Sequence, residues 1–463
     1  MQKSRLKLKV IITTFLVMIL FIALGTTQQI RITSVLAEEP VNHDDVSVAM
    51  KQKKKLTLLV IKNLNAQPIF EFKLKIIDGD IKFIKARGWD RDRVDQSTVT
   101  VHTDNQPVKS GGSLKVIVIG KTNSSYEWLV FDKNGNKITR GHIGNVIEVP
   151  KISLNELEFI LKEYSILDPK SLPLVPLYDK KRDVIWISDI INPGIWKFNP
   201  ETKDFEFFRH DGESSMKLAM DSKGRVWFTD TKTITFGYID PDEHVTRTFR
   251  PPIEGFMIDL QIDSNDNVWI VIINKSKIIR FDSKNENFKI FDLDEDIHPA
   301  AILIDEFERV WFTEIGRGSI GLLDPISNEI VEYQPKDARL VAPASILQES
   351  NGKIWIGEHG GTNITRFDPI TLTFERYFVQ SEYALVSGMI EDRYGNIWYA
   401  EHVTDKIAVL DPETALTKLI QIPSAAPLVQ WLTIDKQGNI WYADPSNSKI
   451  GSITIIEKNT IIN

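Results

Sequence analysis

The sequence predicts an all-β fold, and three observations lead to that prediction: evenly spaced tryptophans, a short phrase repeated around each of them, and turn residues between the phrases. The phrases run from DVIWISD to GNIWYAD, and successive tryptophans stand 41 to 44 residues apart. A period of about 40–50 residues built from short strands is typical of propeller blades. We therefore predict a seven-bladed β-propeller over residues 156–463, with these tryptophans packed between blades: Trp186, Trp227, Trp269, Trp311, Trp355, Trp398 and Trp441.

The second repeat shows how one blade is built. Alternating runs at 217–221, 225–230, 235–240 and 245–249 are separated by residues that favour turns, such as Ser222-Lys223-Gly224. This pattern indicates four antiparallel strands joined by tight connections. Four strands do not bury both faces of a sheet, so neighbouring repeats are expected to stack.

Two segments are candidates for the strand that closes the ring onto the last blade. Residues 158–164 resemble the fourth strand of other repeats, and residues 459–463 offer a second possibility. We favour residues 158–164.

The N-terminus has the pattern of an export segment. Four positive charges fall within the first nine residues, and residues 10–25 carry no charge. We interpret residues 1–37 as a signal peptide, with Val35-Leu36-Ala37 as a cleavage site, or as an uncleaved membrane anchor. The basic residues before the apolar run place the rest of the chain outside the cytoplasm in either case, secreted or anchored to the membrane through this helix.

A second domain is predicted between the export segment and the propeller. We interpret residues 38–53 as a linker and residues 54–149 as an immunoglobulin-like β-sandwich, because about seven alternating strands follow one another there. Trp89 and Trp128 are expected in its core, and the domain is assigned a spacing or adhesive role. The expected strands are 56–62, 70–77, 81–86, 98–102, 114–118, 126–131 and 137–139.

Composition excludes several classes of function. The chain has no cysteine, which excludes disulfides, a thiolate nucleophile and zinc–thiolate sites. The net charge of −7 argues against a nucleic-acid partner, since binding to phosphates needs concentrated Lys and Arg.

The positions three residues after each tryptophan form a set of equivalent places on one face of the predicted ring. Six of the seven are carboxylates, which is a biased set. The positions are Asp189, Asp230, Ile272, Glu314, Glu358, Glu401 and Asp444.

Two consecutive repeats extend this pattern to Glu358-His359 and Glu401-His402, which are 43 residues apart. Equivalent positions on neighbouring blades place the two imidazoles and two carboxylates close together. Such a group binds a divalent cation, magnesium or calcium, through Glu358 and Glu401, or acts as base and acid through His359 and His402. The alternative is that these side chains hydrogen-bond the backbone of adjacent loops. No role is predicted for His43, His102, His142, His210 and His244.

The repeated phrase D-x-x-G-x-[IV]-W-[FY]-[TA]-[ED], followed by K-I-x-x-[FL]-D-P, resembles the virginiamycin B lyase (streptogramin lyase) family of seven-bladed propellers. Residues 392–401 are its closest copy, and the resemblance covers residues 156–463. It implies elimination across the ester of a cyclic depsipeptide, assisted by magnesium. That chemistry needs a base for the α proton and an electrophile for the enolate.

The resemblance also implies functional histidines after a proline, about eleven residues before the tryptophan in late blades. This chain has Ala300, Ala344, Ser387 and Gln430 there, although Pro299 and Pro343 keep the proline.

We expect Ser387, Gln430 and Glu314 to contact a substrate. His298, which lies beside Pro299 in reversed order, is a third candidate catalytic histidine or a solvated loop residue. Because a shared fold does not transfer activity, we predict a non-catalytic module at the cell surface that binds a small molecule or a surface protein at the propeller face. The alternatives are a streptogramin lyase and a gluconolactonase-like lactone or ester hydrolase.

Overall fold

A computed structural model describes residues 46–53, 56–63, 68–76, 83–86, 89–93, 98–103, 107–109, 113–119, 126–133, 137–143 and 153–457, the last without 306, 307, 326, 351 and 370. The predicted export segment, residues 1–37, lies outside these ranges. Within them, no helix is long and apolar enough to cross a membrane. The chain divides into two compact units, before and after residue 150, which we call the N-terminal unit and the propeller unit.

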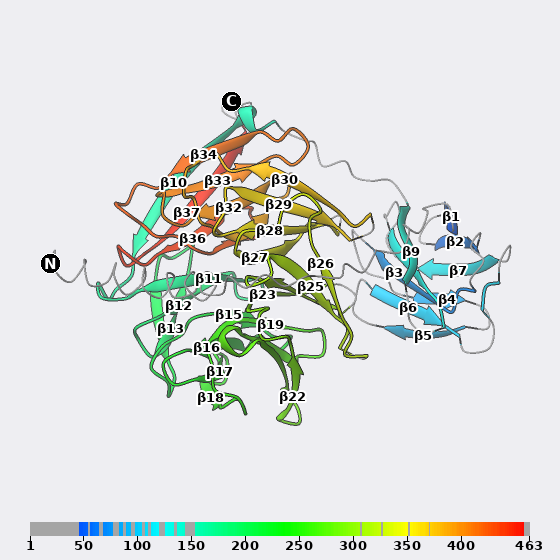
Figure 1. Ribbon diagram of the computed structural model, residues 1–463, viewed down its shortest axis with the longest axis horizontal. Coiled ribbons are helices and arrows are strands. Elements are labelled where there is room, and N and C mark those ends of the chain that lie inside the picture. The colour runs from blue at the N-terminus through cyan, green and yellow to red at the C-terminus, as the bar shows by residue number, and fades with distance from the viewer. Residues whose placement is uncertain are drawn as a thin grey trace. The chain divides into compact units, whose positions relative to one another are not determined.

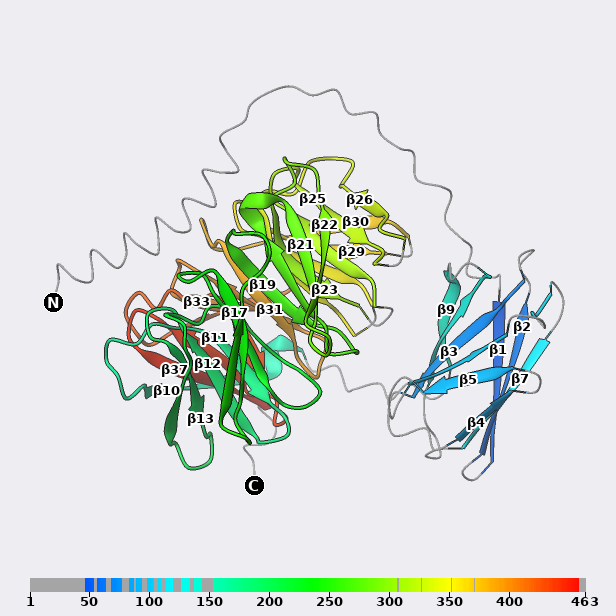
Figure 2. The same ribbon diagram turned by 90° about the horizontal axis from the view of Figure 1, so that it is seen from below.

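The N-terminal unit consists of two antiparallel sheets, with strand orders β1-β2-β7-β4 and β5-β6-β3-β8-β9 (Figure 2). Phe72, Leu74 and Val130 of one sheet and Val116 of the other are buried. The strands are β1 (Val46–Lys53), β2 (Leu56–Asn63), β3 (Glu71–Ile76), β4 (Phe83–Ala86), β5 (Asp90–Arg93), β6 (Thr98–His102), β7 (Ser113–Ile119), β8 (Tyr126–Phe131) and β9 (Lys137–Ile143).

The structure of this unit differs from the sequence predictions in three places. The segment predicted as a linker, residues 38–53, contains β1, which pairs along its whole length with β2. Strand β5 was not predicted at all, and it pairs with β6. Trp89, which was expected in the core, is only partly buried. The side chain of Trp128 lies outside the described part of the chain.

The propeller unit is built from four-stranded antiparallel sheets, which we number in chain order (Figure 1). Sheets one to three contain β11 (Pro173–Asp179), β12 (Val184–Asp189), β13 (Gly194–Phe198), β14 (Phe205–Arg209); β15 (Leu218–Met220), β16 (Val226–Asp230), β17 (Thr235–Asp240), β18 (Val245–Phe249); β19 (Met257–Ile262), β20 (Val268–Ile272), β21 (Lys277–Asp282), β22 (Asn287–Asp292). Sheets four to six contain β23 (Pro299–Ile304), β24 (Val310–Glu314), β25 (Ser319–Leu323), β26 (Ile330–Tyr333); β27 (Pro343–Gln348), β28 (Ile354–Glu358), β29 (Asn363–Asp368), β30 (Thr373–Phe378); β31 (Val386–Glu391), β32 (Ile397–Glu401), β33 (Lys406–Leu410), β34 (Thr417–Gln421).

Sheet seven joins the two ends of the unit. Its strands are β35 (Leu432–Ile434), β36 (Ile440–Asp444), β37 (Lys449–Glu457) and β10 (Leu157–Ser165). Strand β10 pairs with β37 from Leu157 opposite Glu457 to Ser165 opposite Lys449, and Figure 1 shows β10 in teal beside the red β37. The prediction that residues 158–164 fill this place is therefore confirmed. The competing segment, residues 459–463, lies outside the described ranges.

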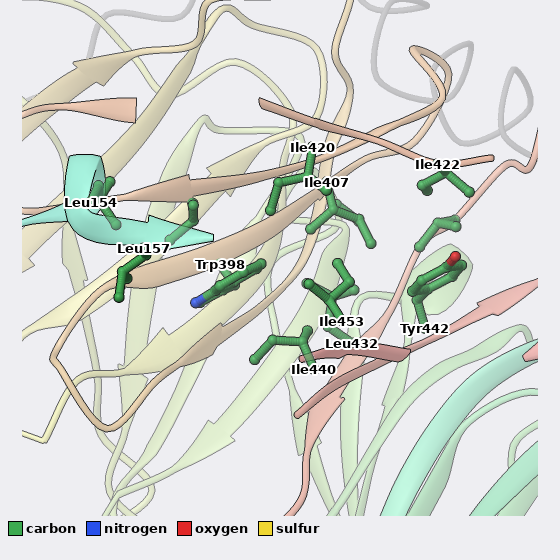
Figure 3. Close-up of a cluster of buried hydrophobic side chains, with 13 residues drawn as sticks. Leu154, Leu157, Trp398, Ile407, Ile420, Ile422, Leu432, Ile440, Tyr442 and Ile453 are labelled. Atoms are coloured by element: carbon green, nitrogen blue, oxygen red, sulfur yellow. The ribbon is translucent and has the colours of Figure 1, made fainter. Parts of the chain in front are cut away.

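Hydrophobic packing fills the space between consecutive sheets. Trp398 of sheet six packs with Tyr442 and Ile453 of sheet seven, and Leu154 and Leu157 cover the same cluster (Figure 3). Leu154 belongs to η2 (Leu154–Glu156), and the other short 3-10 helix is η3 (Ile273–Lys275). All seven repeat tryptophans are buried, as predicted. The all-β, propeller-like fold class is confirmed.

Each repeat tryptophan also makes a polar contact that the packing prediction did not include. Its indole N–H donates to a carboxylate in the turn before its strand. In sheet six, Asp392 Oδ2 accepts from Trp398 Nε1 at 2.8 Å, while Oδ1 accepts from the backbone N–H of Tyr394 at 2.8 Å and of Asn396 at 3.0 Å. The acceptors in chain order are Asp179, Asp221, Asp263, Asp305, Glu349, Asp392 and Asp435.

Removal of one such carboxylate will lower stability strongly. Asp392→Ala leaves a buried indole and two turn N–H groups without their acceptor, so we expect a loss of about 2–4 kcal/mol in the free energy of unfolding. Urea denaturation measures it. Glu382→Ala, at an exposed loop position, is the control, and an equal loss in both variants would contradict the role of the carboxylate.

Candidate functional site

The second strands of all the sheets end at the same side of the propeller unit, where the first strands begin; we call this side the loop face. The six carboxylates predicted to gather there are all buried. Two of them bind the loop that enters their own sheet: Asp189 accepts from Leu172 N at 3.3 Å and Asp230 from Glu213 N at 2.7 Å.

Glu358 has the same structural role. Its Oε2 accepts from the backbone N–H of Val341 at 2.8 Å, and its Oε1 accepts from the hydroxyl of Thr365 at 2.6 Å. The guanidinium of Arg376 lies 3.7 Å from Oε1. Both oxygens are thus used within sheet five.

Glu314 and Glu401 differ because each keeps one oxygen without a partner. Ser319 donates to Glu314 Oε2, and Thr404 donates to Glu401 Oε2 at 2.6 Å. Both Oε1 atoms are buried without a hydrogen bond. Burial raises the pKa of Glu314 to about 8, so this carboxyl is protonated at neutral pH.

The structure brings His359 and His402 together, as their spacing predicts. Their ring centroids are 5.8 Å apart, and the planes are inclined by 31°. His359 is 7% exposed and His402 is 2% exposed. Each follows the last residue of a second strand, β28 or β32, so the equivalent positions on neighbouring sheets place them side by side.

The imidazole of His359 reaches β31, the first strand of the next sheet, and that of His402 reaches the loop just before β35. His359 Nδ1 lies 3.3 Å from Ser387 Oγ and 3.3 Å from the carbonyl oxygen of Val386, and His402 Nε2 lies 2.8 Å from Gln430 Nε2. Ser387 and Gln430 are the residues at which the family resemblance implied histidines. In this chain, imidazoles from the preceding sheet occupy the space beside those two positions.

Burial sets the charge of the pair. Desolvation lowers the pKa of His359 and lowers that of His402 to about 3, with the neighbouring His359 as a second cause. Both rings are neutral at pH 7. His359 Nε2 and His402 Nδ1 have no hydrogen-bond partner. Buried polar atoms normally find partners, and these two nitrogens are exceptions.

The residues do not fit the divalent cation that was predicted and that the resemblance implies. Over the described residues, no three His, Asp or Glu side chains come close enough to hold a metal ion. Glu358, assigned as a metal ligand, is used by Val341 and Thr365, and Glu401 shares its Oε2 with Thr404.

His298, the third candidate, is not brought to the pair. It is partly buried between sheets three and four, where its N–H donates to Ser276 Oγ at 3.3 Å and its carbonyl accepts from Ile315 N. Its backbone has φ of 48°, in the left-handed region. The same left-handed backbone recurs in sheets four to seven, always thirteen residues before the repeat tryptophan, and sequence reasoning missed it. The four residues are His298, Ala342, Leu385 and Leu428.

Sequence reasoning also missed two structural groups. His210, for which no role was predicted, is buried against Phe228 and lies 2.8 Å from Ser215 Oγ. The Lys217 ammonium lies 3.1 Å from Asp259 and 4.8 Å from the ring centre of Trp431. The sequence feature that could have predicted this contact is position in the repeat. Each of the three residues stands ten residues before a repeat tryptophan: Lys217, Asp259 and Trp431.

Comparison with known proteins agrees with this architecture. The model of the Virginiamycin B lyase family matches residues 148–363, a range that includes His359 and ends before His402. No curated protein matches the chain. The propeller is virginiamycin B lyase-like, and the predicted resemblance is confirmed.

Solved structures show the same fold. A streptogramin B lyase is 20% identical, with a TM-score of 0.59 over 64% of this chain and 98% of the other. A catalytically inactive virginiamycin B lyase from Staphylococcus aureus with quinupristin is 20% identical, with a TM-score of 0.60 over 65% and 100%. The β-propeller domain of Myceliophteria thermophila Cps50 (Swd1) is 10% identical, with a TM-score of 0.53 over 62% and 97%. At these identities the likeness concerns the fold alone.

The depressed pKa of His402 predicts acid sensitivity. In the unfolded chain this histidine has a pKa of about 6.5, whereas in the folded protein the pKa of His402 is about 3. Between these two pH values the unfolded state binds a proton that the folded state does not bind. The stability of the fold is therefore highest above pH 6.5 and falls as the pH is lowered. At pH 5 the cost is about 2 kcal/mol relative to pH 7. His402→Gln should lose less stability than the wild type over this range in urea denaturation. The same substitution at exposed His244 is the control, and parallel curves for all three proteins would contradict the assignment.

Proposed function

We propose that the protein is a non-catalytic ligand-binding module whose site is the pair His359 and His402 on the loop face. The observation that carries this proposal is the pair of partnerless ring nitrogens, His359 Nε2 and His402 Nδ1, on neutral rings 5.8 Å apart. A neutral imidazole either donates or accepts at such a nitrogen, depending on its tautomer. Two of them side by side suit a ligand with hydrogen-bonding groups.

The absence of a complementary catalytic group supports binding over elimination. A base alone does not complete that reaction, which also needs an electrophile aimed at the enolate. The side chains beside the imidazoles are Ser387 and Gln430, and the acids next to them in the chain, Glu358 and Glu401, bind threonine hydroxyls. Glu314 belongs to sheet four and is bonded to Ser319. A metal-assisted lyase or a lactone or ester hydrolase at this face is the alternative.

We further propose that the propeller unit is a closed, seven-bladed ring and that the N-terminal unit is an immunoglobulin-like sandwich with a spacing or adhesive role. Contacts between the first strands support the ring: β11 meets β15, each later first strand meets the next, and β11 also meets β35 and β36. The two antiparallel sheets of the N-terminal unit support the sandwich.

Quinupristin, which accompanies the inactive lyase above, is the probe that separates binding from catalysis. We expect saturable binding by calorimetry and no product by chromatography with mass detection, with or without magnesium. Elimination would give a ring-opened isomer of unchanged mass, and hydrolysis would add one water. His359→Ala and His402→Ala should each weaken binding about tenfold, since one hydrogen bond is lost.

His244→Ala is the matched control, because His244 is exposed on the turn between β17 and β18. Binding that both site variants leave unchanged would contradict the proposed site. Turnover abolished by either site variant would replace the binding module with the catalytic alternative.

We also propose that both units lie outside the cytoplasm, secreted or held at the membrane by residues 1–37. The support is the basic start and the uncharged run at 10–25. A reporter active only outside the cytoplasm, fused after Asn463, should be active with the full chain and inactive after deletion of residues 2–25. Equal activity of both fusions would contradict export, and the mass of the mature chain distinguishes cleavage from anchoring.

A further inference from the structure

The exposed large apolar side chains of the propeller unit are unevenly distributed. Over the described part of the chain, five of them lie on outer strands: Ile160, Val245, Ile290, Val331 and Phe378, which is the last residue of β30. The loop face carries six, namely Phe378 and five residues in loops: Leu167, Ile191, Val341, Tyr383 and Val403. Phe378 and Tyr383 are 71% and 72% exposed. Single exposed apolar residues need no explanation, but a concentration at one face indicates a contact surface.

These six residues belong to sheets one, five and six, whereas the loop face over sheets three and four is charged. There Arg317 pairs with Asp294 and Asp296, which lie in the loop between β22 and β23. The loop face thus has an apolar part and a charged part, and the imidazole pair belongs to sheets five and six.

Four of the apolar side chains are attached to the loops that form the imidazole site. Val403 follows His402 directly, and the carbonyl of Val341 accepts from the N–H of Gly360, the residue after His359. Tyr383 lies in the loop that ends at Val386, whose carbonyl faces His359. Phe378 is paired with Asn363, where β29 begins after the His359 loop. We call Val341, Phe378, Tyr383 and Val403 the apolar rim.

One charged side chain beside the rim is already paired. Arg376, on the outer strand of sheet five, pairs with Asp337 and faces Glu358. Both imidazoles are neutral, as derived above. An ionic group placed at the site would lose its hydration without gaining an opposite charge, which is costly. An uncharged polar group loses much less and can bond to the free nitrogens.

We propose that the ligand of the site is a neutral amphiphilic small molecule, with an uncharged hydrogen-bonding head at His359 and His402 and an aromatic or aliphatic body on the apolar rim. This inference rests on the proposed binding site and adds the chemical class of its ligand.

N-Phenyl-1-naphthylamine is a suitable probe, because it is neutral, has one N–H group on an aromatic body, and fluoresces brightly in apolar surroundings. Titration of the full chain should give saturable fluorescence. Phe378→Ser and Tyr383→Asn should each weaken the affinity at least fivefold; asparagine suits position 383 because its φ is 56°. Val245→Ser and Val331→Ser remove comparable exposed apolar side chains from outer strands and should leave the affinity unchanged.

Histidine ring signals in nuclear magnetic resonance, assigned with His359→Ala and His402→Ala, separate this inference from the proposed function. If saturable binding shifts the His359 and His402 signals, and if the affinity falls only in the rim variants, the proposed function and this inference are both supported. If the His359 and His402 signals shift but the probe binds the rim variants as tightly as the control variants, the binding site is supported and the amphiphilic ligand is contradicted. Binding without any shift of these signals overturns the site and, with it, this inference. Absence of saturable fluorescence in the wild type also overturns the amphiphilic ligand.

Discussion

The bond between a turn carboxylate and the indole of the following strand is the interaction on which the propeller unit depends. One oxygen of Asp392 holds the turn by accepting backbone N–H groups, and the other holds Trp398 at the sheet interface. A single carboxylate therefore joins local turn geometry to packing between sheets, which explains why Asp and Trp recur six or seven residues apart. Sheet five uses Glu349, whose longer side chain still reaches Trp355 at 3.0 Å. A buried indole N–H without an acceptor would cost about 1–3 kcal/mol.

This bond lies at the end of each sheet opposite the loop face, and that separation leaves the loop face free to vary. Carboxylates three residues past the tryptophans attach loops, as Glu358 does through Val341. On that frame, two loops carry His359 and His402 to the next sheet. The buried pair of Lys217 and Asp259 contributes at the first strands, where Asp259 also accepts from Ile302 N of sheet four.

The sequence predicted the strands that recur with the tryptophan repeat, and it missed two edge strands of the N-terminal unit. The strands of sheet two and the closing strand β10 were found because similar segments recur in the other repeats. Strands β1 and β5 are edge strands of their sheets, and β5 is the charged segment Asp90-Arg91-Asp92-Arg93, which has no apolar pattern. Repeat spacing placed His359 beside His402. Spacing does not show how far a side chain reaches, so the contacts of the imidazoles with Ser387 and Gln430 could not be predicted from the sequence.

The proposed binding role rests on an exchange of positions at the site. The polar contact between sheets is kept at Ser387 and Gln430, but the imidazoles come from the preceding sheet and are almost fully buried. Burial lowers the pKa of both rings and makes His402, with a pKa of about 3, a weak base. The same burial strengthens each hydrogen bond that a ligand makes with them. The position of these histidines thus supports the proposed binding role, in sheets that are those of a lyase-like propeller.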